Sequence, residues 1–118
     1  MKKLTFHTHF DTAFSALIAL IIAVGCLRIV STYSIFWQTW DEPFHIAAGM
    51  EWLDQGKYTY ETFHPPLSRI MIALGPYLSG LGSVASNSPW QEGQAILHSG
   101  GNYERNLTLA RLGILPFL

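Results

Sequence analysis

The feature that most constrains this chain is an uncharged, apolar run from Thr12 to Leu27. Its 16 residues form about 24 Å of α-helix at about 1.5 Å per residue, whereas a bilayer core of about 30 Å needs about 20 residues. The run can be extended past Arg28, whose charged head would lie among lipid headgroups, into an aromatic stretch at 33–40 that suits an interfacial belt. We therefore expect one transmembrane helix over residues 12–36.

The composition supports a membrane protein or a piece of one. Hydrophobic residues make up 49% of the 118 residues and charged residues only 13%, about half of the roughly 25% typical of globular proteins. This low charge, with 4 Trp, 5 Tyr and 7 Phe, excludes intrinsic disorder. A net charge of −1 offers no basic surface for nucleic acid. The single cysteine, Cys26, excludes an internal disulfide framework and a zinc site built on cysteines.

The distribution of charge predicts an orientation in the membrane. Lys2 and Lys3 precede the apolar run, whereas residues 41–104 carry a net charge of −5, from Lys57 and Arg69 against seven carboxylates. The positive-inside rule places residues 1–11 in the cytoplasm and residues 37–104 in an extracytoplasmic loop. We expect an integral protein of a bacterial inner or plasma membrane.

The first segment has two alternative interpretations. A cleaved signal peptide would need a shorter apolar core followed by a polar sequence. The sequence Ala23-Val24-Gly25-Cys26 faintly resembles a lipoprotein cleavage box, but residues 27–40 are apolar and aromatic where a lipoprotein usually has a polar tether. An uncleaved signal anchor is therefore favoured.

The loop after the first span has the pattern of two amphipathic helices beside the membrane. Asp41-Glu42-Pro43 is a helix start and Gly56 a helix stop, which predicts a helix over 42–55. Apolar residues from Leu67 to Leu81 recur at helical spacing and predict a second helix near 65–82, with a kink at Pro76. Residues 83–103 are rich in Gly, Ser and Asn and are expected to be a loop.

A second apolar pattern begins near Glu104 and continues to the end of the sequence. Residues 105–118 are too few to cross a bilayer. We interpret them as the truncated start of a second transmembrane helix. The expected fold class is an all-α membrane protein with one full span, an extracytoplasmic loop and this partial span.

Several polar residues are candidates for chemistry. Adjacent carboxylates at Asp41 and Glu42 can accept a proton from a hydroxyl or hold a cation, or they can simply stabilise the start of a helix. His45 follows on one helix face, and with His64 it could complete a metal site, for which Asp41, Glu42 and His64 are the candidates. Histidines that hydrogen-bond to the backbone are the commoner alternative.

Two arginines are candidate ligands for a phosphate. Arg69 follows the Pro65-Pro66 turn, and Arg111 lies inside the second apolar run. An arginine at that depth should face a cavity or another helix, or reach the interface, because facing lipid costs about 2.5–3.5 kcal/mol. Its planar fork suits a lipid phosphate. Interfacial anchoring is the alternative for Arg111.

In their order, these segments resemble the start of a polytopic GT-C glycosyltransferase. The similarity is greatest to the group of protein O-mannosyltransferases and aminoarabinose transferases. It rests on Trp40-Asp41-Glu42-Pro43-Phe44-His45, then His64-Pro65-Pro66-Leu67-Ser68-Arg69, and finally Leu109-Ala110-Arg111-Leu112. An acidic pair followed about 20 residues later by His-Pro-Pro-Leu is the specific part of this match.

The resemblance implies transfer of a sugar from a polyprenyl-phosphate donor to a protein, lipid or glycan acceptor outside the membrane. It implies catalytic roles for Asp41 and Glu42, and substrate-binding roles for His45, His64, Arg69 and Arg111. A divalent metal ion is the candidate cofactor, and membrane lipid is a further partner. Family members have many spans, so we expect these 118 residues to be inactive alone. The alternative function is a non-enzymatic, signal-anchored membrane protein or lipoprotein that serves as an assembly subunit.

Overall fold

The computed structural model describes the backbone of residues 2–117 and the side chains of residues 12–117. The chain is 69% helical, with no strand in the part that is described, which confirms the all-α class. It divides into two compact units, one ending at Thr32 and the other beginning at Tyr33.

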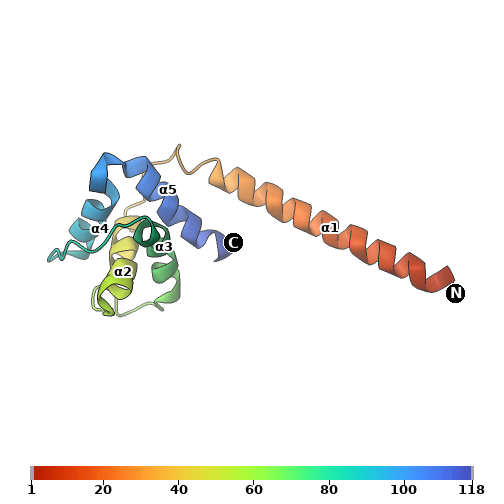
Figure 1. Ribbon diagram of the computed structural model, residues 1–118, viewed down its shortest axis with the longest axis horizontal. Helices are drawn as coiled ribbons and strands as arrows, with labels where there is room; N and C mark the ends of the chain where they lie inside the picture. Colours follow the sequence, from red (N-terminus) through yellow and green to blue (C-terminus); the bar gives the residue numbers. More distant parts are fainter. Residues whose placement is uncertain (1, 118) are drawn as a thin grey trace. The chain divides into compact units, whose positions relative to one another are not determined.

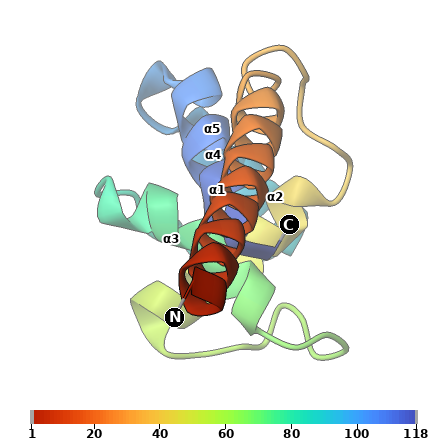
Figure 2. The ribbon, with the colours of Figure 1, turned by 90° about the vertical axis from the view of Figure 1, so that its right-hand side faces the viewer.

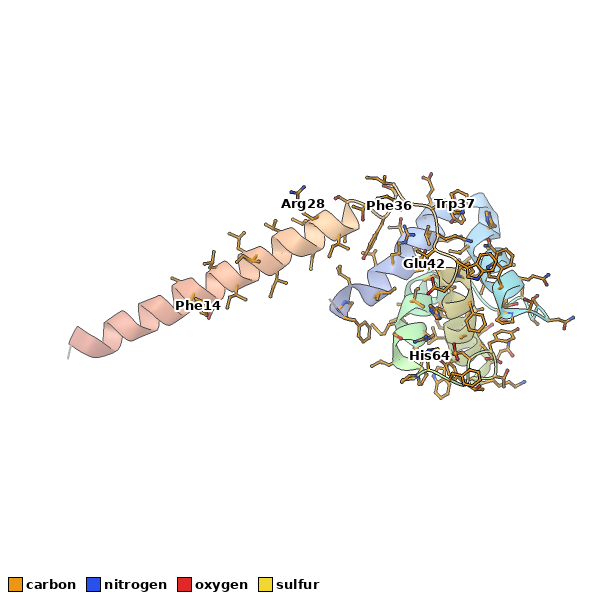
Figure 3. All side chains as sticks on the ribbon, turned by 180° about the vertical axis from the view of Figure 1, so that it is seen from behind. Phe14, Arg28, Phe36, Trp37, Glu42 and His64 are labelled. Carbon is orange, nitrogen blue, oxygen red and sulfur yellow. The ribbon has the colours of Figure 1, made fainter. Side chains whose placement is uncertain are left out.

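The first unit is a single long helix, α1 (Lys2–Val30). Its segment Thr12–Val30 is long and apolar enough to cross a membrane, and none of it is buried within the structure. Large apolar side chains such as Phe14 (57% exposed) and Ile21 (62% exposed) project from it, as Figure 3 shows for Phe14. An all-round apolar helix is stable only when lipid or protein covers it.

Helix α1 ends six residues before the predicted boundary at Phe36. Hydroxyl groups close its last turn, since Ser31 Oγ donates to the Arg28 carbonyl (2.7 Å) and Thr32 Oγ1 donates to the Ile29 carbonyl (2.7 Å). The aromatic residues from Tyr33 onward therefore belong to the second unit and do not extend the span.

The second unit contains four α-helices, which Figure 1 colours from yellow to blue: α2 (Glu42–Gln55), α3 (Leu67–Leu78), α4 (Pro89–His98) and α5 (Tyr103–Ile114). Short 3-10 turns follow at Ser99–Gly101 and Leu115–Phe117. Figure 2 shows the irregular backbone that leads into α2. Helix α2 has the predicted bounds, whereas α3 is shorter than the predicted 65–82, with Pro76 buried in its last turn.

Helix α4 lies inside the segment predicted to be a loop, so that prediction is wrong for residues 89–98. Pro89 opens the helix, and Glu92 lies in its first turn. The Glu92 side chain is fully buried and accepts hydrogen bonds from the Ser83 hydroxyl and from the backbone N–H groups of Val84 and Ser86, each at 2.7 Å. One buried carboxylate thus orders the preceding residues and fixes them to α4.

All four helices contribute to one apolar core. Its buried members are Ile46, Met50, Ile72, Ala73, Ile96, Leu97, Leu107 and Ala110. Glycines allow the helices to approach closely: a Cβ on Gly49 would lie 1.8 Å from the Arg69 carbonyl oxygen, and a Cβ on Gly93 would lie 1.8 Å from the Pro43 carbonyl oxygen. The packing of α2 against α3 and α4 therefore requires these glycines.

Helix α5 packs into this core through Leu107 and Ala110. Asn106 is also buried, and its amide donates to the carbonyls of Leu97 and Ser99, both at 3.0 Å. Among the helices that the structure describes, α1 alone is long and apolar enough to cross a membrane.

Candidate active site

The guanidinium of Arg111 joins α5 to the start of α2. Its Nε and Nη2 donate to the two carboxylate oxygens of Glu42 at 2.8 and 2.9 Å. Nη1 donates to the carbonyls of Tyr33 (2.9 Å) and Phe36 (2.8 Å), and Nη2 also donates to the carbonyl of Trp37 (3.0 Å). An arginine has five N–H donors, so every donor of Arg111 has a protein acceptor.

This arrangement makes Arg111 and Glu42 structural residues. The Tyr33 hydroxyl donates to the Arg111 carbonyl (3.1 Å), and the Thr39 N–H donates to Glu42 Oε2 (2.7 Å). The side chains of Arg111 and Glu42 are only 10% and 13% exposed. Hydrogen bonding to Glu42 raises the pKa of Arg111. No donor remains for a substrate phosphate, so the geometry does not support the predicted substrate-binding role of Arg111 or the predicted catalytic role of Glu42.

Asp41, in contrast, presents its carboxylate to solvent. Its side chain is 65% exposed, with Oδ2 lying 3.3 Å from Nε2 of His45. The Thr39 hydroxyl donates to Oδ1 at 2.7 Å. Asp41 is the N-cap residue of α2, and its side chain makes no capping hydrogen bond to the helix. Asp41 is therefore oriented by two neighbours and remains accessible.

Both members of this pair have lowered pKa values. The hydrogen bond from Thr39 lowers the pKa of Asp41 and outweighs its partial burial, and His45 lowers it further. Burial lowers the pKa of His45, as does the charge of Arg69, against the opposing effect of Asp41. At neutral pH the pair is thus a carboxylate beside a neutral imidazole. With Nε2 donating to the carboxylate, Nδ1 of His45 is an acceptor, and it is buried without a hydrogen-bond partner.

A cavity of about 220 Å³ lies next to this pair, lined by His45, Ser68, Arg69, Ile72 and Ile114. Nη1 of Arg69 donates to the Ser68 hydroxyl at 3.0 Å, whereas its Nε is buried and has no partner. The cavity is smaller than the roughly 300–1,000 Å³ of pockets for drug-sized ligands. It can hold one polar group beside an imidazole and a guanidinium.

His64 lies in a second carboxylate–imidazole pair. Its Nδ1 is 3.1 Å from Oε2 of Glu61, whose side chain is only 6% exposed while that of His64 is 58% exposed. The Phe63 N–H donates to Glu61 Oε1 at 2.9 Å, and this hydrogen bond is the main cause of the lowered pKa of Glu61. The charge of Glu61 also acts on His45 and Arg69.

The predicted metal ligands do not form a site. Figure 3 shows Glu42 and His64 well apart, Glu42 at the start of α2 and His64 in the segment before α3. Glu42 is occupied by Arg111, and His64 is paired with Glu61. Within the part of the chain that the structure describes, no three His, Cys, Asp or Glu residues are placed to hold a metal ion. Asp41, Glu42 and His64 therefore do not fit a shared cation in this arrangement.

Three residues of the site were not predicted. Thr39 orients Asp41, Ser68 lines the cavity, and Glu61 pairs with His64. The i, i+3 spacing of Glu61 and His64 is a signal that could have found the last pair. Nothing in the spacing of Thr39 or Ser68 distinguishes them from other surface hydroxyls.

Chemically, the site offers a neutral imidazole and a cation beside one small cavity, with an ionised, accessible carboxylate paired to that imidazole. These are groups that can orient a hydroxyl and stabilise an anion. No protein-family model, curated protein or solved structure matches the chain.

Proposed function

We propose that this chain is the N-terminal part of a membrane glycosyltransferase that moves a sugar from a polyprenyl-phosphate donor to an acceptor hydroxyl or amine. The observation that carries the proposal is the position of His45, which pairs with the carboxylate of Asp41 and lines one cavity together with Arg69. Sugar transfer needs a group that holds the acceptor and a cation that stabilises the departing phosphate. These three residues supply both.

In this proposal, Asp41 binds the acceptor hydroxyl and removes its proton. Because the Thr39 hydrogen bond keeps its pKa low, Asp41 is ionised throughout the physiological range. Its oxygens can accept a hydrogen bond from the acceptor hydroxyl and take the proton late, as the bond to the anomeric carbon forms. Glycoside hydrolases use carboxylates in the same way at centres that develop oxocarbenium character. His45 positions the carboxylate through Nε2.

In this proposal, Arg69 binds the phosphate group of the donor. Its Nε has no partner, and its Nη1 donates to the neutral hydroxyl of Ser68. Among the side chains of residues 12–117, no carboxylate forms a direct ion pair with it. The cavity beside it has room for a phosphate group, while the lipid chain and the sugar would extend outside it. A guanidinium fork suits phosphate oxygens.

We also propose that the N-terminus is cytoplasmic, that Tyr33 and the residues after it are extracytoplasmic, and that 105–118 lead into a second span. The net charge of −5 over residues 41–104 supports this orientation. A single cysteine at the exposed Asn87, in a Cys26→Ser background, tests it. We expect labelling of intact cells by a membrane-impermeant maleimide, and labelling only after permeabilisation would contradict the orientation.

The activity is tested with the complete reading frame that encodes this chain. Membranes containing its product are incubated with polyprenyl phosphates that carry radiolabelled mannose, glucose or aminoarabinose, and sugar transfer is measured. Arg69→Gln should raise the KM for the donor at least tenfold, whereas Arg105→Gln, an exposed arginine on α5, should leave it unchanged. Absence of transfer from every donor, or equal KM values for the two variants, would contradict the proposal.

One observation favours the second candidate, a non-enzymatic anchored subunit. The residues from Tyr33 onward form a compact unit with a core of their own, as a small interaction domain would. Under this hypothesis, alanine substitutions at Asp41 and Arg69 would leave the biological role intact, and the chain would co-purify with a constant partner. Loss of the role in Asp41→Asn alone would exclude it.

A further inference from the structure

Helix α3 turns its most apolar side away from the core of the second unit. The residues that it buries are Ile72, Ala73 and Pro76. A second set of residues, called here the outer face of α3, lies within an arc of about 100° on the other side of the helix and consists of Leu67, Ile70, Leu74, Tyr77 and Leu78. At about 100° per residue, the centres of the two sets lie roughly 145° apart around the helix axis.

No residue of the outer face is buried. Leu67 is 60% exposed, Tyr77 37% and Leu78 75%, and Ile70 and Leu74 are partly exposed. The face carries no charged residue, and its only polar group is the Tyr77 hydroxyl. A helix at the surface of a water-soluble unit has charged and polar residues on the side opposite the core. The outer face of α3 therefore has the composition of a surface that something apolar covers.

The neighbouring helices contact α3 on its other sides. On α5, a Cβ at Gly113 would lie 1.8 Å from the Met71 carbonyl oxygen, and a Cβ at Gly75 of α3 would lie 2.3 Å from the Leu109 carbonyl oxygen. Helix α2 packs closely on α3 through Gly49. None of these contacts involves a residue of the outer face, so the packing of the second unit leaves that face without a partner.

A bilayer spanned by α1 lies within reach of the second unit. This unit begins at Tyr33, three residues after α1 ends at Val30. Because a chain extends by at most about 3.6 Å per residue, Tyr33 lies within about 11 Å of the end of α1. The covalent connection makes contact between the second unit and the membrane intramolecular, so a small apolar surface is sufficient to hold it there.

We propose that the outer face of α3 lies on the lipid bilayer, with the helix in the plane of the membrane surface and its leucines among the acyl chains. Amphipathic helices that lie in the interface bury their apolar side in this way. Tyr77, which has an apolar ring and a polar hydroxyl, suits the boundary between acyl chains and headgroups.

The composition of the outer face favours lipid over a protein partner. Stable protein interfaces take about 20–30 residues from each side, whereas this face has five. Leucine is under-represented among the residues that dominate binding energy. Packing against another membrane helix favours small residues, but the glycines of this region, Gly49, Gly75 and Gly113, already serve the contacts among α2, α3 and α5.

The test measures the depth of nitroxide labels by EPR power saturation, on the full chain in nanodiscs of phosphatidylcholine. Leu67→Cys, Leu74→Cys and Leu78→Cys are labelled singly in a Cys26→Ser background. Oxygen concentrates among acyl chains, whereas a neutral nickel chelate stays in water. We expect the ratio of oxygen to nickel collision rates at these positions to exceed that at the control positions at least about fivefold.

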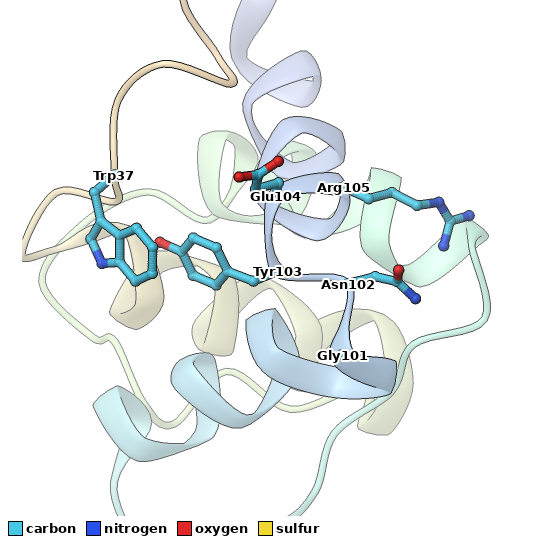
Figure 4. A pocket seen from close by; sticks show the side chains of 6 residues that line it. All are labelled: Trp37, Gly101, Asn102, Tyr103, Glu104 and Arg105. Atoms are coloured by element: carbon cyan, nitrogen blue, oxygen red, sulfur yellow. The ribbon is translucent and has the colours of Figure 1, made fainter.

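The control labels are Asn87→Cys and Arg105→Cys, at two exposed polar residues outside α3. Figure 4 shows the Arg105 side chain extending from α5 away from Trp37 and Tyr103. Because Leu67 and Leu78 are themselves largely exposed, labels there do not disturb the core, and circular dichroism verifies the helical content of each variant.

Each other outcome overturns the proposal. A nickel collision rate at the outer face equal to that at Asn87 would show that the face lies in water. Low rates for both reagents would show that protein covers it, either a further segment of the chain or a partner. Since the face has no charged residue, replacing about a third of the lipid by phosphatidylglycerol should leave the ratio unchanged. A high ratio that appears only with this anionic lipid would show that charge, and not the apolar face, makes the contact.

This inference rests on α1 as a membrane anchor and not on sugar transfer. Asp41→Asn should therefore leave the collision ratio at Leu78 unchanged. A high ratio without sugar transfer from any donor would refute the proposed function alone. Sugar transfer that depends on Asp41, with a low ratio at Leu74 and Leu78, would refute this inference alone.

Discussion

Arg111 and Glu42, 69 residues apart in sequence, are joined by two parallel hydrogen bonds of 2.8 and 2.9 Å. The same guanidinium holds three carbonyls of the segment that leads from Tyr33 to Trp37. Four residues after Trp37, the chain reaches the carboxylate of Asp41 at the start of α2. The ion pair therefore fixes the segment that leads into α2 and to Asp41.

Removal of this arginine should destabilise the second unit strongly. Arg111→Met leaves Glu42 buried without its partner, and breaking a buried ion pair costs about 3–5 kcal/mol. For a unit of this size, this lowers the melting temperature by at least about 12 °C. Thermal unfolding of the full chain in detergent, followed by tryptophan fluorescence, measures the effect.

Arg105→Met is the matched control, since Arg105 lies on the same helix and is exposed. Its effect should stay within about 0.5 kcal/mol. Arg111→Lys should fall between the two, because lysine keeps the charge but loses the planar fork. Similar melting temperatures for Arg111→Met and Arg105→Met would show that the ion pair contributes nothing.

A single methyl group at Gly93 should displace the start of α2. A Cβ there would lie 1.8 Å from the carbonyl oxygen of Pro43 and 2.6 Å from its Cα, and neither backbone atom can move without shifting α2. We expect Gly93→Ala to destabilise the second unit by about 1–3 kcal/mol or more. Denaturant unfolding of the full chain measures this change. Gly25→Ala, where a Cβ meets nothing within 4 Å, should leave the midpoint unaltered.

The groups around His45 predict how the pKa of its imidazole responds to substitution. Burial and Arg69 lower the pKa of His45, and Asp41 opposes them. NMR titration of the imidazole should give a value below the ordinary 6.5 or so. Arg69→Gln should raise the pKa, and Asp41→Asn should lower it further. A pKa that is insensitive to Arg69 would contradict the proposed arrangement of the cavity.

The same shift has a consequence for stability. The unfolded chain takes up a proton at His45 near pH 6.5, but the folded chain does so only at lower pH. The contribution of neutral His45 is therefore complete above about pH 6.5 and is lost as the pH falls through the folded pKa. Melting temperatures from pH 7.5 downward should show this loss in wild type. In His45→Gln the loss over that interval should shrink, and an unchanged profile would rule out His45 as its source.

Much of the helical framework could be predicted from the sequence because its signals are local. Gly56 ends α2 in a left-handed conformation (φ +65°), as its position after the apolar pattern indicates. The uncharged run after Thr12 is likewise a sufficient signal for a long apolar helix. Ser88, Pro89 and Glu92 form a local helix start for α4, but the Gly, Ser and Asn residues around it favour a loop. The tertiary contacts of Glu92 with residues 83–86, which order this segment, cannot be read from the sequence.

The candidate site was predicted in its residue types but not in their division of roles. From spacing alone, Asp41 and Glu42 are equivalent, as are Arg69 and Arg111. The structure separates them, because Glu42 and Arg111 satisfy each other, whereas Asp41 stays exposed and Arg69 keeps a nitrogen without a partner. Glu42 and Arg111 lie 69 residues apart in the sequence, so only the three-dimensional packing could reveal this pairing.

The most direct test of the central claim is sugar transfer by the product of the complete reading frame that carries Asp41→Asn, compared with Asp54→Asn. Both aspartates lie on or beside α2, and Asp54 accepts a hydrogen bond from the Ser83 N–H (2.9 Å) that an asparagine oxygen can also accept. The account predicts at least about a hundredfold loss of transfer for Asp41→Asn, the usual scale of acid–base catalysis, with equal expression and near-normal transfer for Asp54→Asn. Wild-type rates of transfer in Asp41→Asn would contradict it.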